Sequence, residues 1–499
     1  MFYHNYLKFK NISYKKFDFA SFANGINTNY DEKLMPLKYS TNTYNFCFNN
    51  GALKNGLGVS ELKVKYSADD LTKEHGFTLP EGVSALGVWV YNRYSELSQK
   101  YEDYLIVYCS NGQMYLGYMY MNAKLLAPIE GLSFSSLPNV VPYNLNGSDV
   151  LLIGTKEEGL YYYDARYVPH KIDQAPNITS MAIHYERLFV TIDGADKRTL
   201  YFSDDLDPTN WNLTLTEGGF INMMDERGVL NKVVSFNDYL YVFRDFGIAR
   251  VSAYASQEDF YVSQLYTSSG RIYPKTITVC GDTIIFLAND GIYSFNGSST
   301  NKISLNIDKL FKDVSNENAV GTFNNGCFYL ACKLNFNDGE KVGCENEDFV
   351  NNVLLELNLN NGEINLMRGV DIINVQSVNN TIENKTVVCF KSDNKYLMGQ
   401  IDKSGCVMGE PLKKVWHAPK TDFGVSDRLK IITEFYIYSK SDITISFKVD
   451  NKVHNFKVKG SEKVTVVKPN IKGFEFEVSF ICENDNAYLS TPQVKVGYL

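Results

Sequence analysis

Histidine is the side chain that most readily combines metal binding with acid–base chemistry near neutral pH, and this chain of 499 residues has six histidines. No two of them share the spacing of a metal-ligand pair, and the sequence has no HExxH zinc motif, no GxSxG turn and no P-loop. We therefore expect no catalytic, cofactor-binding or metal-binding residues, and we predict that the protein is not an enzyme. The histidines are His4, His75, His170, His184, His417 and His454.

The segment Ser203–Trp211, with the sequence SDDLDPTNW, resembles the Asp-box of sialidase-type β-propellers. It departs from that motif at two places, because Asp207 stands where glycine is expected and Trp211 comes one residue late. An Asp-box is a structural turn and not a catalytic element. We therefore expect this segment to form a turn at the edge of a sheet, with Trp211 packed beneath it.

A second acidic segment, Asn335–Glu340, places oxygen-bearing side chains in an order that is partly like that of a calcium loop. It lacks the bidentate glutamate at the required distance, which favours a solvated insertion. Carboxylates are plentiful elsewhere, but no pair has a context that marks it as the acid and base of a glycosidase. Asn-x-Ser/Thr sequences, such as those at Asn177, Asn212 and Asn296, are expected by chance in a chain rich in asparagine.

The elements that position these residues repeat along the chain. One pattern occurs seven times: a polar turn residue, a short apolar run, a turn that often contains glycine, and a second run rich in aromatic residues. Successive copies start 37 to 59 residues apart, which fits propeller blades of about 40 to 50 residues. Each copy is typical of a β-hairpin. The copies start at Asp103, Asp149, Glu186, Asp238, Asp282, Gly326 and Lys385.

The first run of these copies is apolar on both faces, as in Leu105–Val107 and Ile284–Phe286. A strand has this composition when both faces of its sheet are covered, as they are in a blade that packs between two neighbours. After about residue 420 the pattern changes to strict alternation, which indicates one buried and one solvent-facing side. The alternating segments are Ile443–Val449, Phe456–Val458, Val464–Val466 and Phe474–Phe480.

We therefore predict an all-β protein with a β-propeller of about seven blades, six to eight being compatible with the pattern, followed by a C-terminal β-sandwich. The expected domains are an extended N-terminal segment at 1–40, the propeller at 41–415 and the sandwich at 416–499. We expect the N-terminal segment to lie on the surface and Trp416 to lie at the seam. Two helical turns are expected at each of Ala68–His75 and Ile307–Val314.

Composition narrows the class of protein further. The net charge is −8, and no run of lysine and arginine reaches the density of a nucleic-acid-binding patch, so we do not expect tight phosphate binding. The nine cysteines form no CxxC pair, and several lie in apolar runs such as Val387–Phe390. They are expected to be buried thiols of a protein that assembles in a reducing cytoplasm. We predict no signal peptide and no membrane span.

Several segments together resemble a known family. The stretches Phe22–Thr28, Leu34–Pro36, Tyr44–Phe48 and Gly51–Gly56 are similar to the opening of β-propeller tail proteins of tailed bacteriophages, which are called tail nozzle, tail hub or packaged-DNA stabilisation proteins. Leu34–Pro36 departs slightly from the family pattern, and the insertion at 335–350 has no counterpart in it. Further similar stretches are Glu186–Val190, Leu200–Asp204, Asp207–Trp211, Gly218–Met224, Leu240–Arg244 and Gly247–Ile248.

The resemblance implies a structural protein of the virion tail that forms a homo-oligomeric ring, often of six copies, below the portal and adaptor. Such a ring extends the channel for double-stranded DNA, holds the packaged DNA until ejection, and contacts other tail proteins. No enzymatic residues transfer with it. A negative net charge suits a conduit, because DNA does not adhere to an acidic wall.

Two other hypotheses stay open. The first is a carbohydrate-binding or glycan-cleaving propeller that acts as a receptor-binding tail component, and it predicts carboxylates and exposed aromatic side chains at one mouth of the propeller. The second is a propeller scaffold that binds peptides, and it predicts a soluble monomer without virion association. The copy number, the neighbouring tail proteins, the surface that faces DNA and any gating residue do not follow from the sequence.

Overall fold

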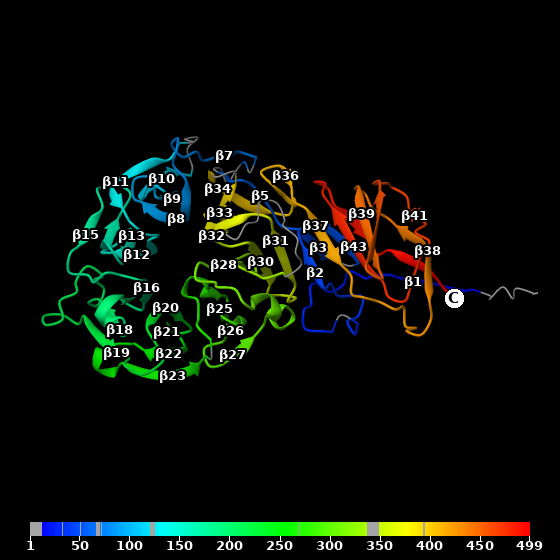
Figure 1. Ribbon diagram of the computed structural model, residues 1–499. Helices are drawn as coiled ribbons and strands as arrows, with labels where there is room; N and C mark the ends of the chain where they lie inside the picture. Colours follow the sequence, from blue (N-terminus) through cyan, green and yellow to red (C-terminus); the bar gives the residue numbers. More distant parts are fainter. Residues whose placement is uncertain are drawn as a thin grey trace, which may run out of the picture.

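The computed structural model describes residues 12–31, 33–49, 51–65, 70, 72–119, 125–268, 270–336, 349–392 and 395–499. In this part of the chain the regular structure consists of β-strands and four short 3₁₀ helices (Figure 1). The predicted all-β fold is confirmed. None of the described helices has the length and apolar character needed to cross a membrane.

Between residues 85 and 402 the described strands form seven successive antiparallel sheets, numbered here 1 to 7. Sheet 1 contains β8 (Ala85–Ser95), β9 (Lys100–Cys109), β10 (Gln113–Tyr118) and β11 (Ala127–Ser133). Sheet 2 contains β12 (Asn139–Leu145), β13 (Ser148–Thr155), β14 (Gly159–Tyr163) and β15 (His170–Ile172). Sheet 3 contains β16 (Ser180–His184), β17 (Arg187–Thr191), β18 (Thr199–Phe202) and β19 (Gly219–Asn222). Sheet 4 contains β20 (Leu230–Phe236), β21 (Tyr239–Arg244), β22 (Gly247–Ser252) and β23 (Tyr261–Thr267).

Sheet 5 contains β24 (Thr278–Cys280), β25 (Thr283–Ala288), β26 (Gly291–Phe295) and β27 (Thr300–Lys302). Sheet 6 contains β28 (Val320–Asn324), β29 (Cys327–Cys332), β30 (Val353–Asn358) and β31 (Ile364–Arg368). Sheet 7 contains β32 (Asp371–Asn379), β33 (Asn384–Ser392), β34 (Lys395–Asp402), β5 (Gly58–Glu61), β35 (Cys406–Val407) and β36 (Glu410–Pro411). The 3₁₀ helices are η1 (Gly194–Asp196), η2 (Gln257–Asp259), η3 (Pro274–Thr276) and η4 (Leu305–Phe311).

The seven hairpins predicted from the repeat are confirmed as the second and third strands of the seven sheets. Their burial explains the apolar composition. In β9, Leu105 and Val107 pack in a core shared with sheet 7, whereas Ile106, which points the other way, packs in a core shared with sheet 2. All three side chains are fully buried. Both faces of the strand are therefore covered by neighbouring sheets.

The first strands of the seven sheets contact one another in cyclic order, with η3 and β24 together bridging sheets 4 and 6, and the cycle closes where β32 meets β8. The sheets accordingly radiate from a common centre (Figure 1). Sheet 7 receives its fourth strand from β5, which precedes sheet 1 in the chain and pairs antiparallel with β34. This pairing joins the two ends of the cycle, and Val59 of β5 is buried against Val388 and Phe390.

The remaining described strands form two five-stranded sheets and two smaller ones. Sheet 8 contains β1 (Ser13–Asp18), β45 (Gln493–Tyr498), β38 (Lys430–Ile437), β41 (Thr465–Val467) and β42 (Ile471–Gly473). Sheet 9 contains β2 (Asn42–Tyr44), β37 (Lys414–His417), β43 (Glu477–Cys482), β39 (Ile443–Val449) and β40 (Lys452–Val458). The smaller sheets contain β3 (Phe46–Asn49), β4 (Ala52–Asn55) and β44 (Tyr488–Ser490), and β6 (Lys63–Lys65) with β7 (Glu74–Gly76).

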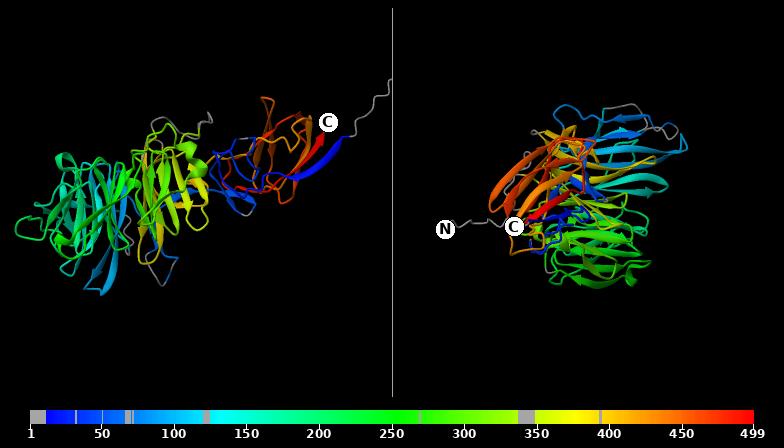
Figure 2. Two further views of the ribbon diagram at one scale, coloured as in Figure 1. Left: turned by 90° about the horizontal axis from the view of Figure 1, so that it is seen from below. Right: turned by 90° about the vertical axis from the view of Figure 1, so that its right-hand side faces the viewer.

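Sheets 8 and 9 lie to one side of sheets 1 to 7 (Figure 2) and share one core, in which Phe435 of β38 packs edge-on against Phe447 of β39. The alternation predicted for Ile443–Val449 is confirmed, because its odd-numbered residues are buried. The prediction is wrong for Val464–Val466, where both valines are exposed, since β41 lies at the edge of sheet 8. Phe474 is also exposed, since β43 begins only at Glu477.

The expectation that the N-terminal segment lies on the surface is wrong for several of its residues. Strand β1 pairs with β45 at the other end of the chain, and Phe19 and Phe22 are buried in the core of sheets 8 and 9. Phe22 meets the ring of Trp416 edge-on at 5.2 Å. The exposed face of β1 is polar, whereas the residues after it are apolar enough to enter a core. The predicted domain limits stay a prediction.

The predicted helical turns differ from the structure. Ile307–Val314 overlaps the 3₁₀ helix η4. Within Ala68–His75, residues 68, 69 and 71 lie outside the described part, and Glu74 and His75 belong to strand β7.

Candidate functional site

The histidines make isolated contacts with protein groups. His75 Nε2 lies 2.9 Å from the carbonyl oxygen of Met119, and His184 Nδ1 lies 2.8 Å from Ser235 Oγ. His417 Nδ1 lies 2.6 Å from Ser479 Oγ. His170 and His454 are exposed, and His4 lies outside the described residues. Across the described ranges, no three His, Cys, Asp or Glu side chains are grouped so as to hold a metal ion.

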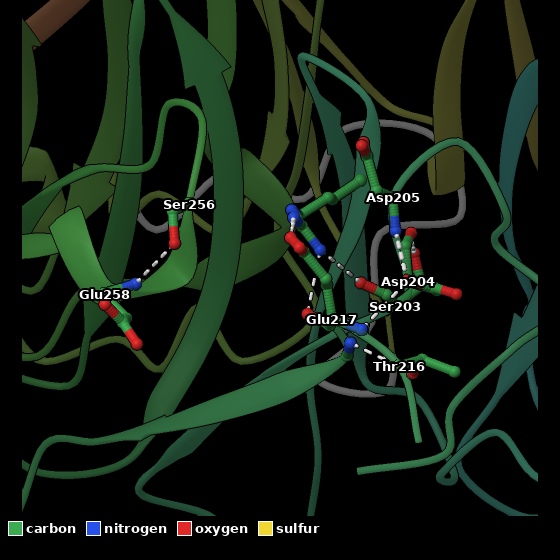
Figure 3. Close-up of polar contacts among 9 residues, drawn as sticks. Ser203, Asp204, Asp205, Thr216, Glu217, Ser256 and Glu258 are labelled. Carbon is green, nitrogen blue, oxygen red and sulfur yellow. Dashed lines mark hydrogen bonds and ion pairs between the residues drawn. The ribbon is translucent and has the colours of Figure 1, made fainter. Parts of the chain in front are cut away.

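The Asp-box-like segment forms the connection between β18 and β19 of sheet 3 (Figure 3). Asp204 Oδ1 accepts hydrogen bonds from the backbone N–H groups of Asp205 and Glu217, at 2.9 and 3.0 Å. Asp204 Oδ2 accepts a third hydrogen bond from Asn210 Nδ2 at 3.1 Å. The carboxylate of Asp204 therefore holds both ends of the loop, which is a structural role.

The expected packing of Trp211 beneath this turn is confirmed. The indole is buried, and its Nε1–H donates to the carbonyl of Pro208 at 2.9 Å. Asp207 Oδ1 accepts from both the backbone N–H and the hydroxyl of Thr209, at 2.9 and 2.6 Å. The side chains of Asp204 and Asp207 thus form hydrogen bonds within the loop that contains them.

One buried cation anchors the same loop, and sequence reasoning missed it. Arg187, at the start of β17, donates to Glu217 Oε2 at 2.7 Å and to the Glu217 carbonyl at 2.8 Å. Its guanidinium also lies about 6 Å from the ring centroids of Phe202 and Phe260. The signal was the Glu-Arg pair that opens the third repeat, because the second residue of every other copy is uncharged.

The polar residues that open the repeats connect neighbouring sheets. Asp103 Oδ2 in sheet 1 accepts from the N–H and the hydroxyl of Thr381 in sheet 7, at 3.0 and 2.8 Å. Asp149 Oδ2 in sheet 2 accepts from the backbone N–H of Tyr94 in sheet 1 at 2.8 Å. These contacts lie where the first and second strands of each sheet are connected. Neighbouring sheets therefore contact each other at the end where their first and second strands are connected.

The segments Tyr44–Phe48 and Gly51–Gly56 lie at the seam between sheets 1 to 7 and sheets 8 and 9. Asn45 is fully buried, and its Nδ2 donates to the carbonyl of Arg368 in sheet 6 at 2.9 Å and to that of Lys413 at 2.7 Å. Its Oδ1 accepts from the Arg368 N–H at 2.8 Å. A Cβ on Gly56 would lie 2.5 Å from the carbonyl oxygen of Asn45, so this approach requires glycine.

Two further buried charges serve the same region. The Lys414 ammonium, in a fully buried residue, donates to the backbone carbonyls of Gly405, Leu412 and Asn484 at 3.2, 3.1 and 2.7 Å. Burial lowers the pKa of Lys414. The buried carboxylate of Glu356 pairs with Lys403 and accepts from Tyr329 Oη at 3.1 Å. Lys414 therefore connects three backbone segments, whereas Glu356 connects other side chains.

Two of the pockets on the described surface have polar or charged linings. The first, of about 450 Å³, lies between the N-terminal segment and sheet 6 and is lined by Asn24, Tyr39, Asn306, Asn361 and Glu363 among others. The second, of about 710 Å³, lies beside η4. Among its lining charges, Lys302 contacts Asp290 at 3.1 Å and Asp308 at 2.9 Å. Neither pocket holds an arrangement of nucleophile and base.

The acidic segment Asn335–Glu340 and the cysteines are only partly within the described residues. In the segment Asn335–Glu340, residues 337–340 lie outside the described part, and the N–H of Asn335 donates to the carbonyl of Leu310 at 2.8 Å. Cys344 also lies outside it. The eight described cysteines are free thiols, six of them buried, and burial raises the pKa of Cys109 and Cys389 to about 12.

Comparison with known proteins identifies no family for this chain. No protein-family model matches it, and no curated protein matches it. Among solved structures, it is similar at 13% identity and a TM-score of 0.38 to PorZ, a bacterial surface component of the type-IX secretion system of Porphyromonas gingivalis, over 71% of this chain and 43% of that one.

Two further solved structures are similar over parts of the chain. One is BBS1N in complex with ARL6DN, with a TM-score of 0.41, 10% identity, and 69% of this chain and 95% of that one covered. The other is Raptor of Chaetomium thermophilum, with a TM-score of 0.40, 9% identity, and 64% and 28% covered. The matched region therefore spans less than half of the PorZ and Raptor chains, and these likenesses carry no inference about function.

Proposed function

We propose that this protein is a structural component of the tail of a tailed bacteriophage. In this role it forms a ring-shaped nozzle or hub below the portal and adaptor, extends the DNA channel and retains packaged DNA until ejection. The observation that carries the proposal is the family-like opening of the chain, at Phe22–Thr28, Leu34–Pro36, Tyr44–Phe48 and Gly51–Gly56. These stretches build the seam of the molecule, where Phe22 and Phe48 enter one core and Ile26 and Tyr44 enter another.

The proposal includes the finer architecture. Sheets 1 to 7 are the blades of a seven-bladed propeller, whose ring is closed by β5, and sheets 8 and 9 are the two layers of a C-terminal sandwich. The cyclic contacts of the first strands support the first statement, and the shared core of sheets 8 and 9 supports the second.

The path of DNA in this proposal is the opening between copies, and not the centre of the seven sheets. The first strands of those sheets carry few charges, and most of their polar side chains are amides and hydroxyls. The net charge of −8 suits a lumen that several copies form together, because DNA does not adhere to an acidic wall. The proposed role requires no enzymatic activity and no cofactor.

The test is to locate the chain in the phage particle. We expect mass spectrometry of purified particles to detect it, and cryo-electron microscopy of their tails to show sheets 1 to 9 as a ring below the portal. A tagged C-terminus should label one level of the tail. Absence of the chain from particles whose portal and capsid proteins are detected would refute the proposal.

One observation favours the carbohydrate-binding alternative. Three tyrosines of sheets 1 and 2 are exposed, namely Tyr94 near the end of β8, Tyr101 near the start of β9, and Tyr167 between β14 and β15. Asp164 lies three residues before Tyr167. Exposed tyrosines can stack on sugar rings. A glycan array with the intact protein separates the two functions, since glycan binding that is lost on Tyr101→Ala and Tyr167→Ala would support the alternative.

A further inference from the structure

Sheets 3 and 4 present an exposed surface that is both acidic and apolar, called here the acidic face. The loops of this face contact one another. The ring centroids of Tyr185 and Tyr254 lie 5.1 Å apart, and the Leu206 N–H donates to the carbonyl of Glu186 at 2.9 Å. Figure 3 shows Asp204, Glu217 and Glu258 of the acidic face. The face comprises residues 185–186, 203–217, 237–238 and 253–260. Its exposed carboxylates are Glu186, Asp205, Glu217, Asp238, Glu258 and Asp259.

These residues include no lysine or arginine. The neighbouring Arg187 is buried and engaged with Glu217, so five of the six carboxylates have no cation paired with them in the described contacts of the face. Large apolar side chains lie exposed among the carboxylates, with Leu215 at 83% and Tyr254 at 67% exposure. A surface with this composition fits a partner that is basic and also carries apolar side chains.

A surface of the complementary kind exists on the same chain. Residues 452–468, called here the basic edge, contain five exposed lysines and a single carboxylate, that of Glu462. In the described contacts, none of these lysines forms an ion pair within 4 Å. Val453, Val464 and Val466 are exposed beside them. The lysines are Lys452, Lys457, Lys459, Lys463 and Lys468.

The basic edge also has backbone groups free to pair. Strand β40 ends the strand order of sheet 9, and among the described strands it pairs with β39 alone. An exposed strand edge offers unpaired N–H and C=O groups to another chain.

The two surfaces lie at opposite ends of the molecule, since β39 and β41 are far from β18 to β23 in Figure 1. They therefore cannot meet within one chain. A contact between unlike surfaces of identical chains is heterologous, and it produces a closed ring when the rotation between neighbours closes. We infer that the basic edge of one copy docks on the acidic face of the next copy. This inference rests on the proposed function, in which the protein forms a ring, and it names the surfaces that join the copies.

Charge-reversal variants test the docking directly. The edge variant carries Lys452→Glu, Lys457→Glu and Lys459→Glu. The face variant carries Glu186→Lys, Asp205→Lys, Glu258→Lys and Asp259→Lys, together with Asp238→Asn, so that its lysines outnumber the remaining carboxylates. None of these eight side chains forms a hydrogen bond or an ion pair in the described contacts, so both variants should fold, which circular dichroism verifies. Assembly is measured by analytical ultracentrifugation of the full chain.

We expect the native chain to assemble at about 50 mM salt and to assemble at least tenfold more weakly at about 500 mM. Each variant alone should remain monomeric, because its two surfaces then carry the same sign. An equimolar mixture of the two variants should assemble again, since each reversed surface meets its complement on the other variant. The expected result is therefore loss of assembly in each variant and recovery in the mixture.

Three results would overturn the inference: a native chain that stays monomeric at low salt, a variant that assembles as the native chain does, or a mixture that stays monomeric. Its failure is distinct from that of the proposed function. A chain located in the tail ring whose variants still assemble would retain the function and refute these surfaces. A chain that assembles through them but is absent from particles would do the opposite.

Discussion

Asn45 offers the sharpest test of how the family-like opening holds the molecule together. Its amide makes three hydrogen bonds to the backbones of sheet 6 and of the approach to β37, and the residue is completely buried. Its φ of 60° lies in the left-handed region, which asparagine and glycine tolerate better than alanine does. Replacing Asn45 by alanine removes the hydrogen bonds and adds backbone strain.

The magnitude follows from these two contributions. A buried hydrogen bond contributes about 1 kcal/mol, so the loss of three lowers the free energy of unfolding by about 3 kcal/mol. The left-handed conformation costs alanine about 1 kcal/mol more. We therefore expect about 4 kcal/mol for Asn45→Ala and about 3 kcal/mol for Asn45→Gly, because glycine adopts this conformation without strain.

Asn470 provides the matched control, because it has a φ of 54° and is exposed. Asn470→Ala should lower the free energy of unfolding by about 1 kcal/mol, which is the strain alone. Urea unfolding followed by tryptophan fluorescence measures all three variants, and Trp416 lies in the adjoining core. The reasoning fails if Asn45→Ala and Asn470→Ala lose the same stability.

Three other variants probe further polar groups, namely His184→Gln, Lys414→Met and Asp204→Ala, and Asp205→Ala is the control for the last of them. Burial lowers the pKa of His184 to about 4, against a small opposing effect of Asp238. The folded protein therefore holds the ring neutral, and its free energy of unfolding decreases as the pH falls from 6.5 towards 4. The loss approaches roughly 3 kcal/mol at pH 4, and His184→Gln should remove it from the pH dependence of unfolding. Lys414→Met should cost about 3 kcal/mol in urea unfolding, since three buried carbonyls lose their donor, and a value near zero would contradict this role. Asp204→Ala should lower stability by about 2 kcal/mol while Asp205→Ala changes it by less than about 0.5 kcal/mol, and equal effects would refute the structural role of the turn.

The sequence predicted those parts of the fold that depend on local patterns. Runs such as Leu105–Val107 are apolar on both faces because two neighbouring sheets cover them, and this requirement is visible within three residues. The Asp-box-like turn is equally local, since the Asp204 carboxylate bonds to groups at most 13 residues away. Both features could therefore be read without knowledge of the tertiary structure.

Long-range pairings left no such signal. Strand β5 pairs in sheet 7 with β34, which lies more than 330 residues further along the chain. Nothing in the sequence GVSE of β5 predicts this partner. In the same way, β1 is a polar strand whose pairing with β45 depends on the distant end of the chain. Backbone hydrogen bonds between strands are indifferent to side-chain identity, so the choice of partner is decided by the cores that form around them.

The wrong prediction of a buried face at Val464–Val466 in sheet 8 also arose because a local pattern does not show which strands lie next to each other. Alternation at Val464–Val466 predicts a buried face only if a second sheet covers that face, and β41 lies at the edge of its sheet, where no described strand does so. Exposed apolar residues that follow the alternation of a buried strand are typical of an interface with another molecule. Lys463 and Lys468 flank these valines, which is the composition that the proposed contact with the acidic face of another copy requires. The failure of the local rule at this edge and the proposed contact between copies thus have one physical cause.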